Sequence, residues 1–569
     1  MSSYWKVDDT ARIGQTFISI PSENGLSYSA GQKIQIFVGA DTKYMDGHNS
    51  YLEFNVKIQA PAGSIPTRLQ LDEMGGTCLI KNLRIYDGTR AHLLEELDSY
   101  SSLCSVRYDY DTDKSIRNVR ALREGSSVHT PDNRGTRGTS QTAMANTRTN
   151  PYFQASSGDQ TTAFDNTFFL TAKVCIPLHC GIFAQNEHIF PVAMTSGLYM
   201  ELDLAPASEV IKQLDSVLRL RRAPLNPVNK ETVAAGGKFT KLLIKTDNNI
   251  GGSDAISKFP LVVGETFGMC KADNTSTLAV FDVAAEIASI ALNVGEVEIT
   301  LKAEVTVTGA LDDSFVLYST AVEGDARTVV ASYEPTYTVS NVNLVVSQIM
   351  LDPAYERGML QKVREGGTIE LDILTATNYK NSILATDRQT TFQVFSQNSR
   401  AKSLLIIPQD SSVYTAKQAI TGLDGYEILK NQDSEDTHLL SNRAGYTGIC
   451  DELKDIQYQI GGRLVPSRPI DVSKIASRKS IDNFHLYELE KCLDNAGIVP
   501  RSFRAYQSNF VFGRGFGVND GCHDLRGKDL AVILKYTGSG EPQKPKLFNS
   551  FVVHIRKLMI SDGGVNVVL

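Results

Sequence analysis

Two cysteines and a histidine lie close together in the segment KVCIPLHCGIF, at Cys175, His179 and Cys180. Thiolate and imidazole are the ligands that zinc prefers, and structural zinc sites usually take them from pairs such as CxxC. No second pair of this kind is present in the chain. Because cysteine is also commonly buried as a small hydrophobic residue, we interpret the cluster as structural and predict no metal-binding residue.

The glycines of GRGFG, residues 513–517, resemble a loop that binds phosphate groups. A dinucleotide fingerprint needs GxGxxG between a strand and a helix, whereas this motif lies within FVFGRGFGVND and leads into another strand. A β-bulge or a turn is therefore the better interpretation.

Carboxylates are plentiful, as in the pair Glu95 and Glu96 and the run Asp109, Asp111 and Asp113. Paired acids can hydrolyse glycosides, but the run lacks the glycine and the bidentate glutamate of a calcium loop. We expect it to be a solvated loop. The histidines share no motif with a serine or cysteine nucleophile, and Walker, HExxH and GxSxG motifs are missing from the sequence. The sequence therefore predicts no catalytic residue, no cofactor and no enzymatic activity.

The elements that carry these residues belong to a long chain of ordinary globular composition. Its 569 residues are 42% hydrophobic and 21% charged, and its net charge is −7, which argues against coating nucleic acid by charge alone. Eight cysteines are too few for a disulfide scaffold and suggest a reducing compartment. The start MSSYWKVDDT lacks the apolar region of a signal peptide, and the most apolar stretch, 277–294, is interrupted by acids.

Strict alternation of apolar and polar residues is the dominant pattern. In YLEFNVKI, residues 51–58, four apolar residues alternate with polar ones, as in a strand with one buried face. The pattern recurs at residues 34–38, 198–204, 297–307, 369–373 and 456–460. Half-exposed strands of this kind are typical of antiparallel sheets, so we predict an all-β fold of sandwiches or barrels.

Helices are predicted at only three places, each with leucine or other apolar residues on one face. They are residues 90–103, 207–220 and 482–497, the last ending at Gly497. We expect them to lie across the ends of the sandwiches.

The chain divides into two parts near residues 353–367, a turn-rich link between two β-rich halves. The first part, 1–355, contains polar or glycine-rich stretches at 125–163 and 223–275, and the second part, 356–569, contains one at 408–450. We expect these stretches to be inserted loops at one end of the sandwiches.

Several of these segments resemble the double jelly-roll major capsid proteins of double-stranded DNA viruses, the group of Polinton-like viruses, virophages and, more distantly, adenovirus hexons. The segments that carry the resemblance cover most of the chain: 51–58, 78–103, 168–204, 455–471 with the 482–497 helix, and 551–569.

The resemblance implies two eight-stranded antiparallel jelly rolls side by side, one in each part of the chain. It further implies a structural protein of the virion, assembled inside the host cell, whose homotrimers form pseudo-hexameric capsomers of an icosahedral shell. The implied partners are neighbouring capsomers and penton and minor capsid proteins, with an internal membrane or the genome on the inner face and no sequence-specific nucleic acid.

Two alternatives stay open at this stage. One is a viral attachment or glycan-binding β-sandwich protein, and the other is a paired-jelly-roll hydrolase. As interface residues we predict Tyr152 and Phe153, because aromatic residues isolated in a polar loop often mark contact sites; a contact with the subunit's own core is an equal alternative.

Overall fold

The computed structural model describes most of the β-structure and the helices that join it. The described residues are 3–4, 12–59, 68–72, 74–112, 120, 123–125, 171–184, 189–214, 228–229, 233–245, 266–271, 279–293, 296–312, 315–319, 336–410, 446–448, 450, 453–472, 483–501, 509–516, 522–536, 545–561 and 564–568. The interface residues Tyr152 and Phe153 and the whole 125–163 stretch apart from Gly125 lie outside these ranges, as does most of 408–450.

The first half of the chain forms a sandwich of two antiparallel sheets. One sheet has the order β2-β18-β5-β9, and the other has the order β4-β10-β7-β8. Their strands are β2 (Arg12–Pro21), β4 (Lys33–Val38), β5 (Met45–Gln59), β7 (Ile80–Asp87), β8 (Leu93–Leu97), β9 (Thr171–Pro177), β10 (Leu198–Leu204) and β18 (Thr336–Leu351), with β3 (Ser27–Ser29) added beside β18.

The second half forms a second sandwich of the same kind. One sheet contains β19-β26-β21-β24 in that order, and the other contains β20-β25-β22-β23. These strands are β19 (Ile369–Ile383), β20 (Gln389–Gln393), β21 (Ala401–Asp410), β22 (Leu453–Ile460), β23 (Arg463–Asp471), β24 (Phe512–Gly515), β25 (Leu530–Tyr536) and β26 (Lys546–Ser561).

The two sandwiches share one topology. If the eight strands of each are counted along the chain, one sheet has the order first, eighth, third, sixth, and the other has the order second, seventh, fourth, fifth. This is the strand order of a jelly roll, with two Greek keys folded face to face. The predicted all-β fold and its two jelly rolls are confirmed, and we call them roll 1 and roll 2.

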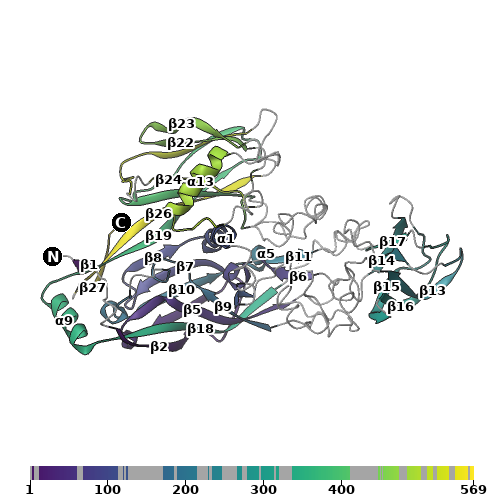
Figure 1. The fold of residues 1–569 in the computed structure, drawn as a ribbon, viewed down its shortest axis with the longest axis horizontal. Coiled ribbons are helices and arrows are strands. Elements are labelled where there is room, and N and C mark those ends of the chain that lie inside the picture. The colour runs from purple at the N-terminus through teal and green to yellow at the C-terminus, as the bar shows by residue number, and fades with distance from the viewer. Residues whose placement is uncertain are drawn as a thin grey trace.

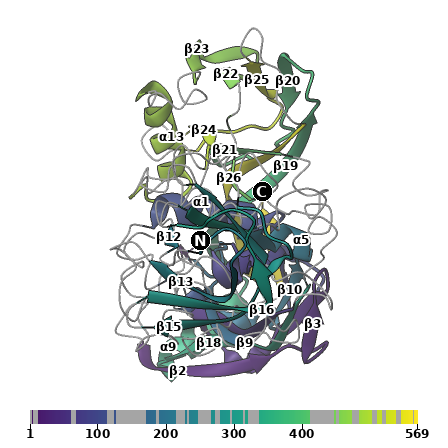
Figure 2. The same ribbon diagram turned by 90° about the vertical axis from the view of Figure 1, so that its right-hand side faces the viewer.

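A closed barrel is inserted before the last strand of roll 1. It has the order β12-β13-β16-β15-β14-β17, and it lies at one end of the molecule, beside roll 1 (Figures 1 and 2). Its strands are β12 (Val228–Asn229), β13 (Lys238–Lys245), β14 (Thr266–Lys271), β15 (Ala285–Asn293), β16 (Glu296–Thr306) and β17 (Phe315–Ser319). The structure therefore differs from the loop expected at 223–275, because the described residues of that stretch are strands of a barrel that continues to Ser319.

The opposite end of the molecule holds both termini and the link between the rolls (Figure 1). Helix α9 (Pro353–Arg364) is this link, and the Asp352 carboxylate caps its first turn by accepting from the N–H groups of Ala354 and Tyr355. Strand β1 (Ser3–Tyr4) pairs with β19, and β27 (Gly564–Val568) pairs with β26. Both ends of the chain are thus joined to roll 2.

One hydrophobic core runs through both rolls, and the barrel has a core of its own. The shared core explains why the rolls form one block (Figure 2), since neither covers its apolar surface alone. Among the described helices none is long and apolar enough to cross a bilayer.

The predicted helix at 482–497 is confirmed as α13 (Asn483–Asn495), but the other two helices were wrong in part. Residues 93–97 form β8, paired with β7, and the helix α1 (Tyr100–Asp111) begins only after Ser99, whose φ is 54°. Residues 207–214 form one helical turn, α5 (Ala207–Val210), and then β11 (Ile211–Leu214), which pairs with β6 (Arg68–Leu71). In both places pairing with a neighbouring strand prevails over an apolar spacing that also suits a helix.

Candidate assembly surfaces

The junction between the rolls contains a buried network of hydrogen bonds. Helix α1 follows the fifth strand of roll 1, and ten of its twelve residues are buried, including Ser101, Ser102 and Ser105. Side chains this small let the helix lie close to neighbours on both sides. Consequently α1 is enclosed between roll 1 and roll 2 rather than lying on a surface.

Hydrogen bonds from α1 reach three separate segments of roll 2. Ser105 Oγ donates to the carbonyl of Tyr446 at 3.2 Å, the Arg107 guanidinium donates to the carbonyl of Gly497 at 3.2 Å, and the Tyr110 hydroxyl donates to the carbonyl of Asn509 at 2.9 Å. In the other direction, the Arg501 N–H donates to the carbonyl of Tyr110 at 2.9 Å. Each bond orients one roll against the other because its two partners belong to different rolls.

Asn509 is a buried member of this group whose side chain bonds to two other segments. Its side-chain amide donates to the buried carboxylate of Asp109, and its side-chain oxygen accepts from the Gly448 N–H at 2.7 Å. Asp109 belongs to α1, whereas Asn509 and Gly448 belong to roll 2. The expectation that the aspartate run is a solvated loop was therefore wrong for Asp109, which is 1% exposed.

A second buried carboxylate, Glu95 on β8, lies at the end of the junction next to β26. It accepts from the N–H groups of Gly181 at 2.6 Å and Ile182 at 3.1 Å, in the connection that follows β9. Next to it, the Arg556 guanidinium of β26 donates to the carbonyl of Leu94 at 2.8 Å. Burial raises the pKa of the Glu95 carboxyl, although these N–H groups and Arg556 favour its charged form.

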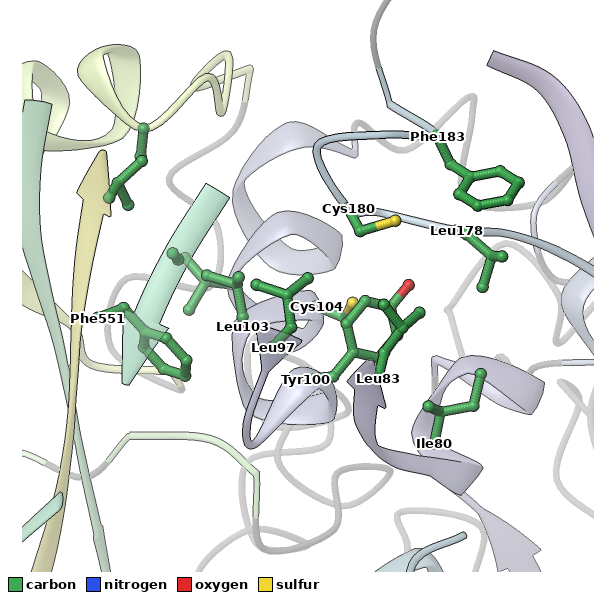
Figure 3. Packing of buried hydrophobic residues seen from close by; sticks show 14 of the residues in the cluster. Ile80, Leu83, Leu97, Tyr100, Leu103, Cys104, Leu178, Cys180, Phe183 and Phe551 are labelled. Carbon is green, nitrogen blue, oxygen red and sulfur yellow. The ribbon is translucent and has the colours of Figure 1, made fainter. Parts of the chain in front are cut away.

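Apolar side chains complete the junction between these polar groups. Figure 3 shows Leu97 and Leu103 on the side of α1 that faces Phe551 of β26, while Tyr100 and Cys104 lie toward Cys180. All of these side chains are at most 6% exposed. The packing explains why β26 is buried on both of its faces from Phe548 to His554.

The Cys175, His179 and Cys180 cluster lies at the end of β9 and in the connection that follows it. His179 and Cys180 are buried, and burial lowers the pKa of the imidazole and raises that of the thiol. Cys175 is half-buried on the outer face of β9. Among the described residues no group of three histidine, cysteine or acidic side chains could hold a metal ion, and Cys175 and Cys180 are free thiols.

The first three residues of the GRGFG motif, 513–515, lie in a regular strand, so the bulge or turn predicted there was wrong. Residues 512–515 are β24, which pairs with β21 without a shift of register. A Cβ atom on Gly513 would lie 2.3 Å from the Leu404 carbonyl oxygen and 2.5 Å from Cys492 Sγ. The glycines are needed because α13 and β21 approach this strand closely.

An open cavity of about 1170 Å³ lies between α13, β24 and the β22–β23 turn. Its charged side chains include Arg514, which pairs with Glu488 at 2.8 Å, and Lys528, which lies 3.2 Å from His523 Nε2. Both acidic and basic side chains line this cavity, so its charge does not favour a ligand of one sign.

Large apolar side chains are exposed on both rolls. On roll 1, Ile13 and Phe17 of the edge strand β2 are 63% and 57% exposed. On roll 2, Tyr487 of α13 and Val499 after it are 54% and 56% exposed. Large apolar side chains that remain outside in a single chain commonly mark contacts with other chains.

Comparison with known proteins gives structural similarity only. No protein-family model matches the sequence, and no curated protein matches it. Among solved structures, the chain is similar to the Faustovirus major capsid protein, with 8% identity, coverage of 99% of this chain and 92% of that chain, and a TM-score of 0.48. It is also similar to the PBCV-1 virus capsid (10% identity, 100% and 98% covered, TM-score 0.46) and to the mavirus major capsid protein (11%, 100% and 92%, TM-score 0.36).

Proposed function

We propose that this protein is a major capsid protein, the repeated structural subunit of an icosahedral virus shell. The observation that carries the proposal is the repetition of one jelly-roll topology in two rolls, fixed to each other through the buried α1 junction. Two equivalent rolls in one rigid chain let three chains present six similar units around an axis, which suits hexagonal tiling. The function of such a subunit depends on the contacts that its surfaces make with neighbouring subunits.

The barrel lies at one end of the molecule, and α9 with both termini lies at the other (Figure 1). In the proposed shell the barrel end faces outward, and the end with α9 faces the interior. An inserted barrel with its own core suits the outer end, because its strands add surface without changing the core of the rolls. Neighbouring capsomers, penton and minor capsid proteins then contact the sides and the inner end.

The experiment that tests the proposal is the mass of the purified protein in solution, measured by light scattering coupled to gel filtration. We expect about 187 kDa, three times the 62.4 kDa of the chain. Electron microscopy of the same fractions should show particles with a hexagonal outline. A monomer at micromolar concentration would overturn the proposal, because obligate interfaces of this class bury more than about 2,000 Å².

A further inference from the structure

The two rolls are repeats, and one contact between them is already visible inside the chain. In both rolls a helix follows the fifth strand: α1 follows β8 in roll 1, and α13 follows β23 in roll 2. Helix α1 lies against the sheet of roll 2 that contains β19, β26 and β21. The helix of roll 1 therefore covers a sheet of roll 2.

Three contacts define the sheet that α1 and the end of β8 cover. Gln409 of β21 donates to Ser102 Oγ at 3.3 Å, Lys380 of β19 pairs with Asp98 at 2.7 Å, and Phe551 of β26 lies beside Leu103 (Figure 3). This is the sheet of first, eighth, third and sixth strands.

In the described part of the chain, no α-helix packs on the outer face of the equivalent sheet of roll 1. Its inner residues on β5, Leu52, Phe54 and Val56, are buried, but the alternating outer residues from Tyr51 to Lys57 are only half-buried. Across the same outer face lie the exposed Ile13 and Phe17 of β2 and the half-buried Cys175 of β9. We call this surface the open face, defined by Ile13, Phe17, Tyr51, Glu53, Lys173 and Cys175.

Helix α13 is exposed on the side that α1 buries. Its inward residues include Leu489, Cys492 and Leu493, which are fully buried against roll 2. Its outward residues form the helix face, defined by Tyr487, Glu490, Lys491 and Asp494, all of which are exposed. Within the described residues, therefore, roll 2 has a sheet covered by the helix of roll 1, whereas the equivalent sheet of roll 1 and helix α13 each have an exposed face.

We propose that the helix face of one subunit packs on the open face of the next subunit, in a ring that closes after three chains. The open face is thus covered by a second copy of this chain. The contact between chains would repeat the one inside the chain, where the helix of one roll covers a sheet of the other. The inference rests on the proposed function, because it takes the closed threefold ring from the capsomer. When the same head-to-tail contact is repeated around a threefold axis, the ring of three chains closes with this one type of interface.

Chemistry at the two faces suits this contact. The open face has an aromatic and an aliphatic side chain at its edge strand, and the helix face has Tyr487 as a matching aromatic anchor. The open face carries Lys57 and the ion pair of Lys173 with Glu53 at 3.1 Å, and the helix face carries Glu490, Asp494 and Lys491. Charged groups of both signs around an apolar centre are the usual arrangement of a specific interface.

The test compares Phe17→Asp and Tyr487→Asp with the unchanged protein by light scattering over a dilution series. Each substitution places a charge in all three contacts of the ring. If each contact weakens about tenfold, the dissociation constant of the trimer rises about 1,000-fold. Phe395→Asp is the matched control: Phe395 is 74% exposed in the connection between β20 and β21, outside both faces, and this variant should stay within about threefold of the unchanged protein.

Thiol labelling gives a second measurement that does not depend on a substitution at the contact. Cys175 lies on the open face, whereas Cys522 is exposed away from it. In the trimer Cys175 should react at least tenfold more slowly than in the dissociated Phe17→Asp variant, and Cys522 should react equally in both. Circular dichroism of each variant establishes that it is folded.

The outcomes separate the two proposals. If the unchanged protein is monomeric, the proposed function fails. If it is trimeric but both aspartate variants form trimers as tight as the control, or Cys175 reacts equally fast in trimer and monomer, the contact is elsewhere and the capsid function stands.

Discussion

Asn509 offers a direct test of how the rolls are held together. In the variant Asn509→Leu the side chain keeps its approximate volume but loses both of its polar partners. The Gly448 N–H loses its acceptor at 2.7 Å, and the buried Asp109 carboxylate loses a donor. Leaving one buried polar group unsatisfied costs about 1–3 kcal/mol, and more for a charged group. We therefore expect the free energy of unfolding to fall by about 3–5 kcal/mol.

Guanidinium unfolding at one fixed protein concentration measures this loss, followed by fluorescence and circular dichroism. Because one core runs through both rolls, the two probes should report a single transition for the rolls. The matched control is Asn49→Leu, which removes an exposed asparagine whose amide donates to Asp46 at 2.7 Å. We expect the control to change stability by less than about 0.5 kcal/mol. Equal stability of the two variants would refute the argument that the buried Asp109–Asn509 pair holds the junction.

Two further variants test the interior of roll 2. Burial lowers the pKa of His485 to about 3, so the unfolded chain binds a proton below about pH 6.5 that the folded chain does not, and stability falls as the pH falls from 6.5 toward 3. At pH 5 this residue should lower the free energy of unfolding by about 2 kcal/mol relative to pH 7, and His485→Phe should remove this loss in unfolding curves measured at pH 7 and pH 5. If the variant and the unchanged protein lose the same stability between the two pH values, the assignment is contradicted. Gly513→Ala should destabilise by about 1–3 kcal/mol because its Cβ meets Leu404 and Cys492, whereas Gly309→Ala, with open space around its Cβ, should melt within about 1 °C of the unchanged protein.

The strands were predictable because alternation is a local property. Residues 51–58, 198–204 and 456–460 each show one apolar face in the sequence, and each is a strand of a jelly roll in the structure. Helix α13 was predictable for a related reason: one face is apolar, the other charged, and a glycine ends it. In such segments the side-chain pattern and the surroundings agree.

Segments whose partners lie far away in the sequence were not predictable. The spacing of Leu93, Leu94 and Leu97 suits a helix, but this segment pairs with β7 as a strand. Its Glu95 then accepts a hydrogen bond from the Gly181 N–H inside the junction. Similarly, Asp109 has the composition of a solvated run, and only the arrival of Asn509, 400 residues away, makes it a buried group. No local pattern contains the position of such a partner.

Helix α1 nevertheless carries a signal that composition could have revealed. Its sequence YSSLCSVRYDYD has a single basic residue, Arg107, and no glutamate or lysine, whereas α13 has glutamates, lysine and aspartate along one side. A helix without a charged face has no surface suited to water, and it is stable only when it is enclosed. Small polar residues such as Ser102 and Ser105 fit that position, because their hydroxyls bond to backbone and side-chain groups of the other roll. The contrast between the two helices therefore has a physical meaning: α1 is built for a contact that is complete within one chain, and α13 combines a buried face with a charged and aromatic face that a neighbouring chain can cover.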